Sequence, residues 1–205
     1  MKNSILTWII LLLNLGMYLY MMYALGLEFG EDPTPEDLIQ VGGVTSDTPL
    51  YTWFTSMFLH SSVNHLALNM LSLTAMSSMV IYVYGRLSYL IGYFVSGIGA
   101  SFAVANFTTY TVVVGASGAI CGLFGMLVIG LLFRNKRERI DMSFVGINII
   151  LLSIITFAFS NVSVESHVGG FITGIIVGLI FSIISSIFSY SSEGERLEWL
   201  VRYSC

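Results

Sequence analysis

Four polar residues stand within or beside apolar stretches of this chain and have the types needed for nucleophilic catalysis: His65, Asn69, Ser117 and His167. Serine is a weak nucleophile at neutral pH and needs a base within hydrogen-bonding reach, which a neutral histidine supplies. His65 and Asn69 are four residues apart, so both project from one face of a helix. Both are also hydrogen-bond donors of the kind that stabilises an oxyanion. The set predicts acyl transfer.

The segment around Ser117 favours that chemistry. Ser117 lies between Gly115 and Gly118, at the expected start of a helix. Unpaired backbone N–H groups and the positive end of the helix dipole favour a developing oxyanion there. The two glycines allow close approach of a substrate backbone or a neighbouring helix. Because a lone serine between glycines is more often a helix-packing surface, the interpretation depends on all four polar residues occurring together.

The composition indicates which elements must position these residues. The chain has 205 residues, of which 56% are hydrophobic and 10% charged, whereas a soluble domain carries about 25% charged residues. This excludes a water-soluble globular protein and predicts an integral membrane protein. A net charge of −4 offers no basic face for nucleic acid. The two cysteines, Cys121 and Cys205, supply neither a disulfide framework nor a thiolate metal cluster.

Six apolar runs have the length of a membrane-spanning helix, which is about 20 residues. The runs are residues 5–25, 63–84, 87–105, 115–133, 142–160 and 167–188. Strands are excluded because the runs are too long and do not alternate. The predicted fold is an all-α polytopic membrane protein, a six-helix bundle. Its membrane domain covers residues 1–190 with a long outer loop at 26–62, and residues 191–205 form a short cytoplasmic tail.

The charges predict the orientation of these helices. Six spans put both termini and two short loops on one side of the membrane, and all eight basic residues lie there: Lys2, Arg86, Arg134, Lys136, Arg137, Arg139, Arg196 and Arg202. The other side has no basic residue and seven carboxylates: Glu28, Glu31, Asp32, Glu36, Asp37, Asp47 and Glu165. By the positive-inside rule both termini are cytoplasmic. We expect a bacterial plasma membrane and an active site that opens to the extracytoplasmic side.

This topology brings the four polar residues to one depth. The second, fourth and sixth spans carry them, each near its outer end. Polar groups inside a membrane are costly and therefore indicate function. Their occurrence at one depth on three helices favours a catalytic site over three separate structural residues.

Three segments resemble the signature regions of the rhomboid intramembrane serine proteases. They are Gly115-Ala-Ser-Gly118 with the two residues after it, His65-Leu-Ala-Leu-Asn69, and the segment from His167 to Gly174. They occur on the second, fourth and sixth spans, in the family's order. The resemblance implies a six-helix fold that hydrolyses peptide bonds in or next to the transmembrane segments of membrane-protein substrates.

The resemblance also implies roles for individual residues. Ser117 matches the nucleophile and His167 the general base, a dyad without an aspartate. His65 and Asn69, with the backbone N–H of Ser117, match the groups that stabilise the oxyanion. The supporting residues include Gly115 and Gly118 beside the nucleophile. His60 matches a structural histidine, and Gly170 and Gly174 match small residues that let the sixth helix pack closely on the fourth.

Two positions depart from the family pattern. Cys121 stands where many bacterial members have a tyrosine that stacks on the catalytic imidazole, and we expect it to be a small buried apolar residue. Tyr51-Thr52 replaces a Trp-Arg pair that is typical of the outer loop. Neither change removes a reacting group.

Two other classes of function are alternatives to the protease. One is a catalytically inactive rhomboid-like protein that binds or escorts membrane clients. Relatives of this kind have typically lost the dyad. The other is a transporter or channel, which would be expected to show inverted repeats or a charged pathway. The proposed chemistry requires no cofactor, and three histidines with no intramembrane carboxylate beside them are a poor metal site. The expected partners are substrate transmembrane segments and the lipid bilayer.

Overall fold

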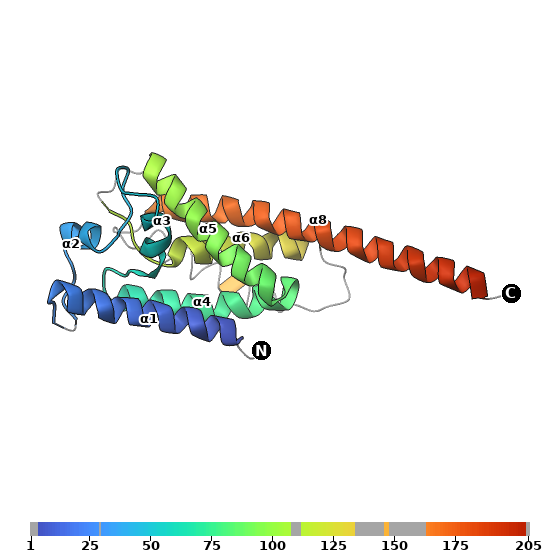
Figure 1. Cartoon of the computed structure of the whole chain (residues 1–205), viewed down its shortest axis with the longest axis horizontal. Coiled ribbons are helices and arrows are strands. Elements are labelled where there is room, and N and C mark those ends of the chain that lie inside the picture. The colour runs from blue at the N-terminus through green and yellow to red at the C-terminus, as the bar shows by residue number, and fades with distance from the viewer. Residues whose placement is uncertain (1–3, 29, 108–111, 134–145, 148–162, 204–205) are drawn as a thin grey trace.

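The protein is all-helical in a computed structural model that describes residues 4–28, 30–107, 112–133, 146–147 and 163–203, with side chains as far as residue 187 (Figure 1). Its long helices are α1 (Ile5–Leu25), α4 (Val63–Tyr84), α5 (Arg86–Phe107), α6 (Ser117–Phe133) and α8 (Val164–Tyr203). Shorter helices are α2 (Pro35–Gln40), α3 (Thr52–Thr55) and the 3₁₀ turn η1 (Ser56–Phe58). Within the described ranges the only β contact is an isolated antiparallel bridge between Val44 and Val113.

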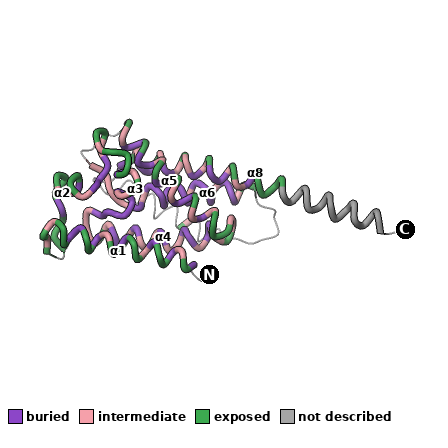
Figure 2. The backbone as a smooth tube through the Cα atoms, viewed as in Figure 1, coloured by how far each residue is buried: buried purple, intermediate pink, exposed green. Residues whose placement is uncertain are grey.

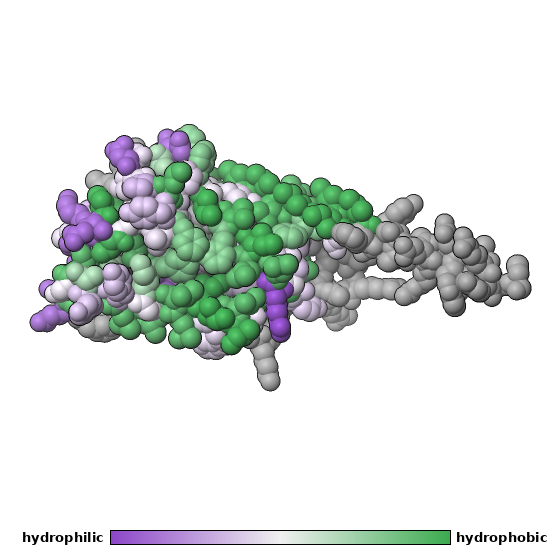
Figure 3. Space-filling model, viewed as in Figure 1, coloured by the Kyte–Doolittle hydropathy of each residue, from purple (hydrophilic) through white to green (hydrophobic). Residues whose placement is uncertain are grey.

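Within the described ranges four helices are long and apolar enough to cross a membrane: Ile5–Leu25, Val63–Tyr84, Arg86–Phe107 and Val164–Ile187. α6 is equally apolar but has 17 residues. Large apolar side chains such as Leu12 and Ile176 are exposed on the outer faces of these helices. The visible surface is hydrophobic along the helices and hydrophilic at the end where α2 lies (Figure 3). A continuous exposed apolar surface of this kind requires lipid, so the chain is an integral membrane protein.

Some elements differ from the sequence expectation. The segment 26–62, predicted as a loop, contains α2, α3 and η1. The last helix begins at Val164, three residues before the predicted start, because the Ser163 hydroxyl accepts the Ser166 N–H at 3.2 Å and caps it. It continues to Tyr203 through the predicted tail. The basic cluster from Arg134 to Arg139 lies outside the described residues, and so does the predicted span 142–160 apart from residues 146–147.

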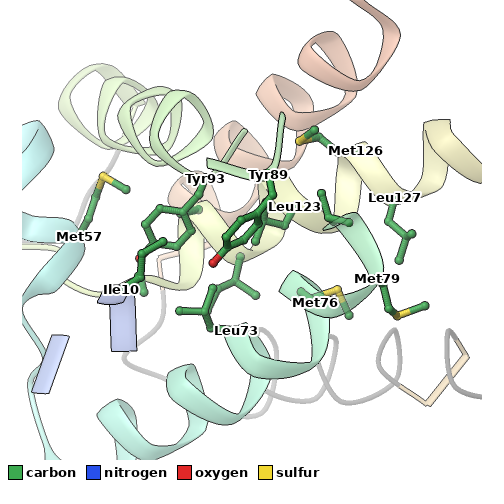
Figure 4. Close-up of a cluster of buried hydrophobic side chains, with 14 of the residues drawn as sticks. Ile10, Met57, Leu73, Met76, Met79, Tyr89, Tyr93, Leu123, Met126 and Leu127 are labelled. Carbon is green, nitrogen blue, oxygen red and sulfur yellow. The ribbon is translucent and has the colours of Figure 1, made fainter. Parts of the chain in front are cut away.

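α6 runs through the middle of the bundle, between α4 on one side and α5 and α8 on the other (Figure 1). Most of its residues are buried, unlike those of α1, which bury one face only (Figure 2). An apolar cluster from α1, η1, α4, α5 and α6 fills the space beside it, with Tyr89, Tyr93, Leu73 and Leu123 in contact (Figure 4). The central helix is therefore held from several sides.

Glycines set the distance between α6 and α8. A Cβ atom on Gly170 would overlap the carbonyl of Gly118, and one on Gly174 would overlap the carbonyl of Gly122. The two backbones thus touch directly over two turns. Lipid gives no hydrophobic driving force between helices, so close approach through small residues is how such helices associate.

Farther along this helix pair, a tyrosine joins both helices to α4. The Tyr84 hydroxyl, at the end of α4, lies 3.0 Å from the Met126 carbonyl of α6 and 3.1 Å from the Ser182 hydroxyl of α8. It donates to the carbonyl and accepts from the serine, so one side chain connects three helices. Ser182 is buried, so its hydroxyl has few partners other than Tyr84 and its own helix.

Replacing Tyr84 by Phe is expected to lower the free energy of unfolding in mixed micelles by about 1 kcal/mol, because it removes hydrogen bonds and no apolar contact. The matched control is Tyr23→Phe, since Tyr23 is 86% exposed and lies on α1. Equal stability of the two variants would show that the hydrogen bonds of the Tyr84 hydroxyl do not stabilise the helix bundle.

Candidate active site

A pocket of about 380 Å³, here called the site pocket, lies where α4, α6 and α8 begin. His65, Ser117 and His167 all line it. These residues are far apart in the sequence and come from three different helices. The structure therefore brings together three of the four polar residues singled out from the sequence.

Ser117 is the first residue of α6, and its position is fixed by the backbone before it. Val44 and Val113 exchange N–H to carbonyl hydrogen bonds of 3.0 and 2.9 Å, and the Gly115 N–H donates to the Ser56 carbonyl at 2.8 Å. Gly115 then turns the chain with φ of 119°. The nucleophile candidate thus follows a segment attached to the outer loop at two points.

Gly115 also makes room for His65. A Cβ atom at Gly115 would lie 2.8 Å from Cε1 and 2.9 Å from Nε2 of the His65 ring. The positive φ would strain any other residue in addition. Glycine is therefore needed here for two independent reasons, and the imidazole of His65 lies directly against the backbone that precedes Ser117.

His65 and Asn69 lie one turn apart on α4. Asn69 Nδ2 donates to the His65 carbonyl at 2.9 Å, and His65 Nδ1 is 3.1 Å from the Ser61 hydroxyl. The Ser62 hydroxyl accepts the His65 N–H at 3.1 Å and caps the helix. The Ser61 contact leaves Nε2 of His65 for other groups in the pocket. Asn69 is buried below His65 and is not among the residues that line the site pocket.

His167 is the fourth residue of α8, and its side chain is only 4% exposed. Its N–H donates to the Ser163 carbonyl at 3.3 Å. The Glu165 carboxylate accepts a hydrogen bond from the Ser163 hydroxyl at 3.0 Å, so this carboxylate is engaged at the start of α8. The close glycine contacts between α6 and α8 bring this end of α8 beside the start of α6.

The two remaining sequence candidates are buried beside the site. His60 is fully buried, and its ring packs edge-on against that of His65 at a centroid distance of 5.1 Å. Burial lowers the pKa of His60 to about 3, and the nearby His65 adds to this. His60 is therefore neutral at physiological pH. Cys121, one turn after Ser117, is 4% exposed within the packed helix.

Several residues of the site pocket were not singled out from the sequence: Asp32, Ser61, Ser163 and Ser166. The serines stand next to helix starts, where a serine usually caps the helix. In the sequence Asp32 indicates only the charge of the outer side of the membrane. Among the described residues no group of three His, Cys, Asp or Glu side chains is arranged to hold a metal ion.

A family model described as the Rhomboid domain matches residues 47–184, more than half of the chain. The chain belongs to the rhomboid family. The match includes α4, α6 and α8 as far as residue 184, and with them every residue of the candidate dyad and oxyanion site.

Curated rhomboid relatives agree with this assignment. Rhomboid protease GluP of Bacillus subtilis (strain 168) is 32% identical over 168 residues, covering 78% of this chain and 32% of GluP. Rhomboid protease AarA of Providencia stuartii is 30% identical over 200 residues, covering 82% of this chain and 69% of AarA. RHOMBOID-like protein 1 of Arabidopsis thaliana is 30% identical over 138 residues, 65% of this chain and 35% of that protein. The chain thus spans about a third of the length of GluP.

Gly115→Ala is expected to lower the free energy of unfolding of this rhomboid by about 1–3 kcal/mol. The added methyl group would overlap the His65 ring, and alanine disfavours the positive φ of this position. Gly16→Ala is the control, since no atom lies within 4 Å of its added Cβ. Detergent unfolding curves measure both. A Gly115 variant as stable as the Gly16 variant would show that the close contact with His65 is unimportant.

Proposed function

We propose that this rhomboid is an intramembrane serine endopeptidase that hydrolyses peptide bonds in or next to the transmembrane helix of membrane-protein substrates. The observation that carries the proposal is the site pocket, which Ser117, His167 and His65 line together. Membership of a family that includes the proteases GluP and AarA supports it. The substrate must unwind locally, because a helical peptide bond is shielded by its own hydrogen bonding.

The reaction follows the serine-protease scheme with a dyad. Ser117 Oγ attacks the carbonyl carbon of the scissile bond while His167 takes the hydroxyl proton. The tetrahedral intermediate then collapses, the C–N bond breaks, and His167 gives the proton to the leaving amine. Water, deprotonated by His167, hydrolyses the acyl-enzyme and restores Ser117. No cofactor takes part in these steps.

The negative charge on the tetrahedral intermediate needs donors placed in advance. In this proposal they are the backbone N–H of Ser117, at the first position of α6, and the side chains of His65 and Asn69. His65 is supported by the Ser61 hydroxyl on Nδ1, which leaves its other ring nitrogen for the substrate. Asn69 bonds the His65 carbonyl through Nδ2, so it must turn to reach the oxyanion itself.

The topology belongs to the same proposal. Six membrane spans, the fifth within residues 142–160, put both termini in the cytoplasm, and the membrane domain covers residues 1–190. The eight basic residues on one side and the seven carboxylates on the other support this orientation. The site pocket then opens to the extracytoplasmic side of a bacterial plasma membrane, where water reaches Ser117 from outside.

Ser117→Ala and His167→Ala are expected each to reduce cleavage of a single-span fusion in liposomes by about 10³-fold or more, because each removes a reacting group. Ser186→Ala is the matched control, since its hydroxyl bonds the Ser182 carbonyl on α8, away from the site pocket. A fluorophosphonate is expected to label Ser117 in the wild type only. Wild-type protein that neither cleaves nor labels would favour the inactive, client-binding alternative.

His65→Ala and Asn69→Ala are expected to lower kcat by about 10²–10³-fold with little change in KM, because oxyanion donors act mainly in the transition state. Ser61→Ala is expected to cause a smaller loss of kcat, since Ser61 only orients the His65 ring. Thr74→Ala serves as the control, because its hydroxyl bonds the Met70 carbonyl within α4. A change confined to KM would assign His65 to substrate binding instead.

A further inference from the structure

The site pocket has one charged wall that the catalytic scheme does not use. Asp32, Pro33, Pro35 and Leu38, from the segment that leads into α2, line the pocket together with Ser117 and His167. Pro33 and Leu38 are buried and attach this segment to the protein. Asp32 is exposed, so its carboxylate is accessible from the pocket and from solvent.

Local structure on both sides fixes the position of Asp32. Before it, Glu28 and Glu31 form a closed turn, in which the Glu31 N–H donates to the Glu28 carbonyl at 3.0 Å and the Glu28 N–H donates to the Glu31 carboxylate at 2.8 Å. After it, Thr34 and Asp37 form a capping box at the start of α2. Pro33 further restricts the backbone of the residue that precedes it. The backbone at Asp32 is therefore restrained on both sides, which keeps the residue at the wall of the site pocket.

Other carboxylates of this face are engaged in local structure. The Glu31 carboxylate accepts from Glu28 and that of Glu165 accepts from Ser163. Asp37 accepts from the Thr34 hydroxyl at 2.6 Å and from its N–H at 2.9 Å, and these bonds hold the pKa of Asp37 below its ordinary value. Glu28, Glu36 and Asp47 do not line the site pocket. Among the described residues Asp32 is the one carboxylate that lines the site pocket.

The sequence on both sides of this carboxylate contains no lysine or arginine over a long stretch. No basic residue of either kind occurs between Lys2 and Arg86, between Arg86 and Arg134, or between Arg139 and Arg196. Within the described part of the chain Asp32 makes no ion pair and no side-chain hydrogen bond. An uncompensated negative charge that lines a pocket favours a ligand that brings a positive charge.

We propose that Asp32 is a specificity-determining residue that selects substrates with a lysine or arginine beside the scissile bond, on the outer side of the membrane. The proposal rests on the proposed protease function. Because Asp32 remains in contact with water, the selection is modest. We expect a substrate with Lys to be cleaved with a kcat/KM about two- to fivefold higher than the same substrate with Gln.

The test uses full-length protein in zwitterionic liposomes and a single-span fusion that it cleaves. Lys, Gln and Glu are placed in turn at successive outer positions flanking the cleavage site, and the Lys-to-Gln ratio of kcat/KM is measured. At the preferred position this ratio is expected to exceed one in the wild type and to fall to about one in Asp32→Asn. Asp32→Lys is expected to reverse the order, so that the Glu substrate is cleaved faster than the Lys substrate. Added salt is expected to reduce the wild-type ratio.

Glu36→Gln is the matched control, because Glu36 is an exposed carboxylate on α2, two residues before Leu38, and does not line the site pocket. A ratio lowered equally by Glu36→Gln and Asp32→Asn would overturn the proposal, since the preference would then come from the whole acidic face. Ser117-dependent cleavage with a Lys-to-Gln ratio of one at every position would also overturn the role of Asp32, but it would agree with the proposed protease function. Absence of Ser117-dependent cleavage would instead overturn the proposed function.

Discussion

The direct contact between the backbones of α6 and α8 is the constraint on which the site depends. Gly170 and Gly174 face the carbonyls of Gly118 and Gly122 with no space for a side chain. In a bilayer such contacts, and not hydrophobic burial, hold helices together. Because Ser117 begins one helix and His167 lies in the first turns of the other, the spacing of the axes also sets how close the two side chains can come.

A second constraint is the cost of polar groups inside the membrane. Around the site pocket the structure meets it by pairing polar groups locally: Asn69 with the His65 carbonyl, Ser61 with the His65 ring, and Ser163 with Glu165. Farther along the helices the Tyr84 hydroxyl joins α4, α6 and α8 by the same means. Polar bonds thus stabilise the helices that carry the site at two levels.

Much of the helical architecture could be predicted from the sequence, because a span of about 20 apolar residues is a local signal. The three polar motifs could also be recognised in the sequence, since each occupies a few neighbouring residues. What the sequence did not indicate is how the outer segment meets the site. The Val44–Val113 bridge, the Gly115 bond to Ser56 and the position of Asp32 in the pocket all join residues distant in the chain. Such contacts depend on the tertiary fold and leave no periodic pattern.

The direction of the helices adds an electrostatic property that no single residue carries. α4, α6 and α8 all begin at the site pocket, where Ser61, Ser62, Ser117 and Ser163 lie among its lining residues. Each helix start presents unpaired N–H groups and a partial positive charge. Three such ends around one cavity favour a developing oxyanion over a buried cation, and they favour the neutral form of a histidine that must act as a base. Asp32 of the outer segment lines the same cavity, so the site combines positive helix ends at the reacting atoms with a negative side chain in its wall.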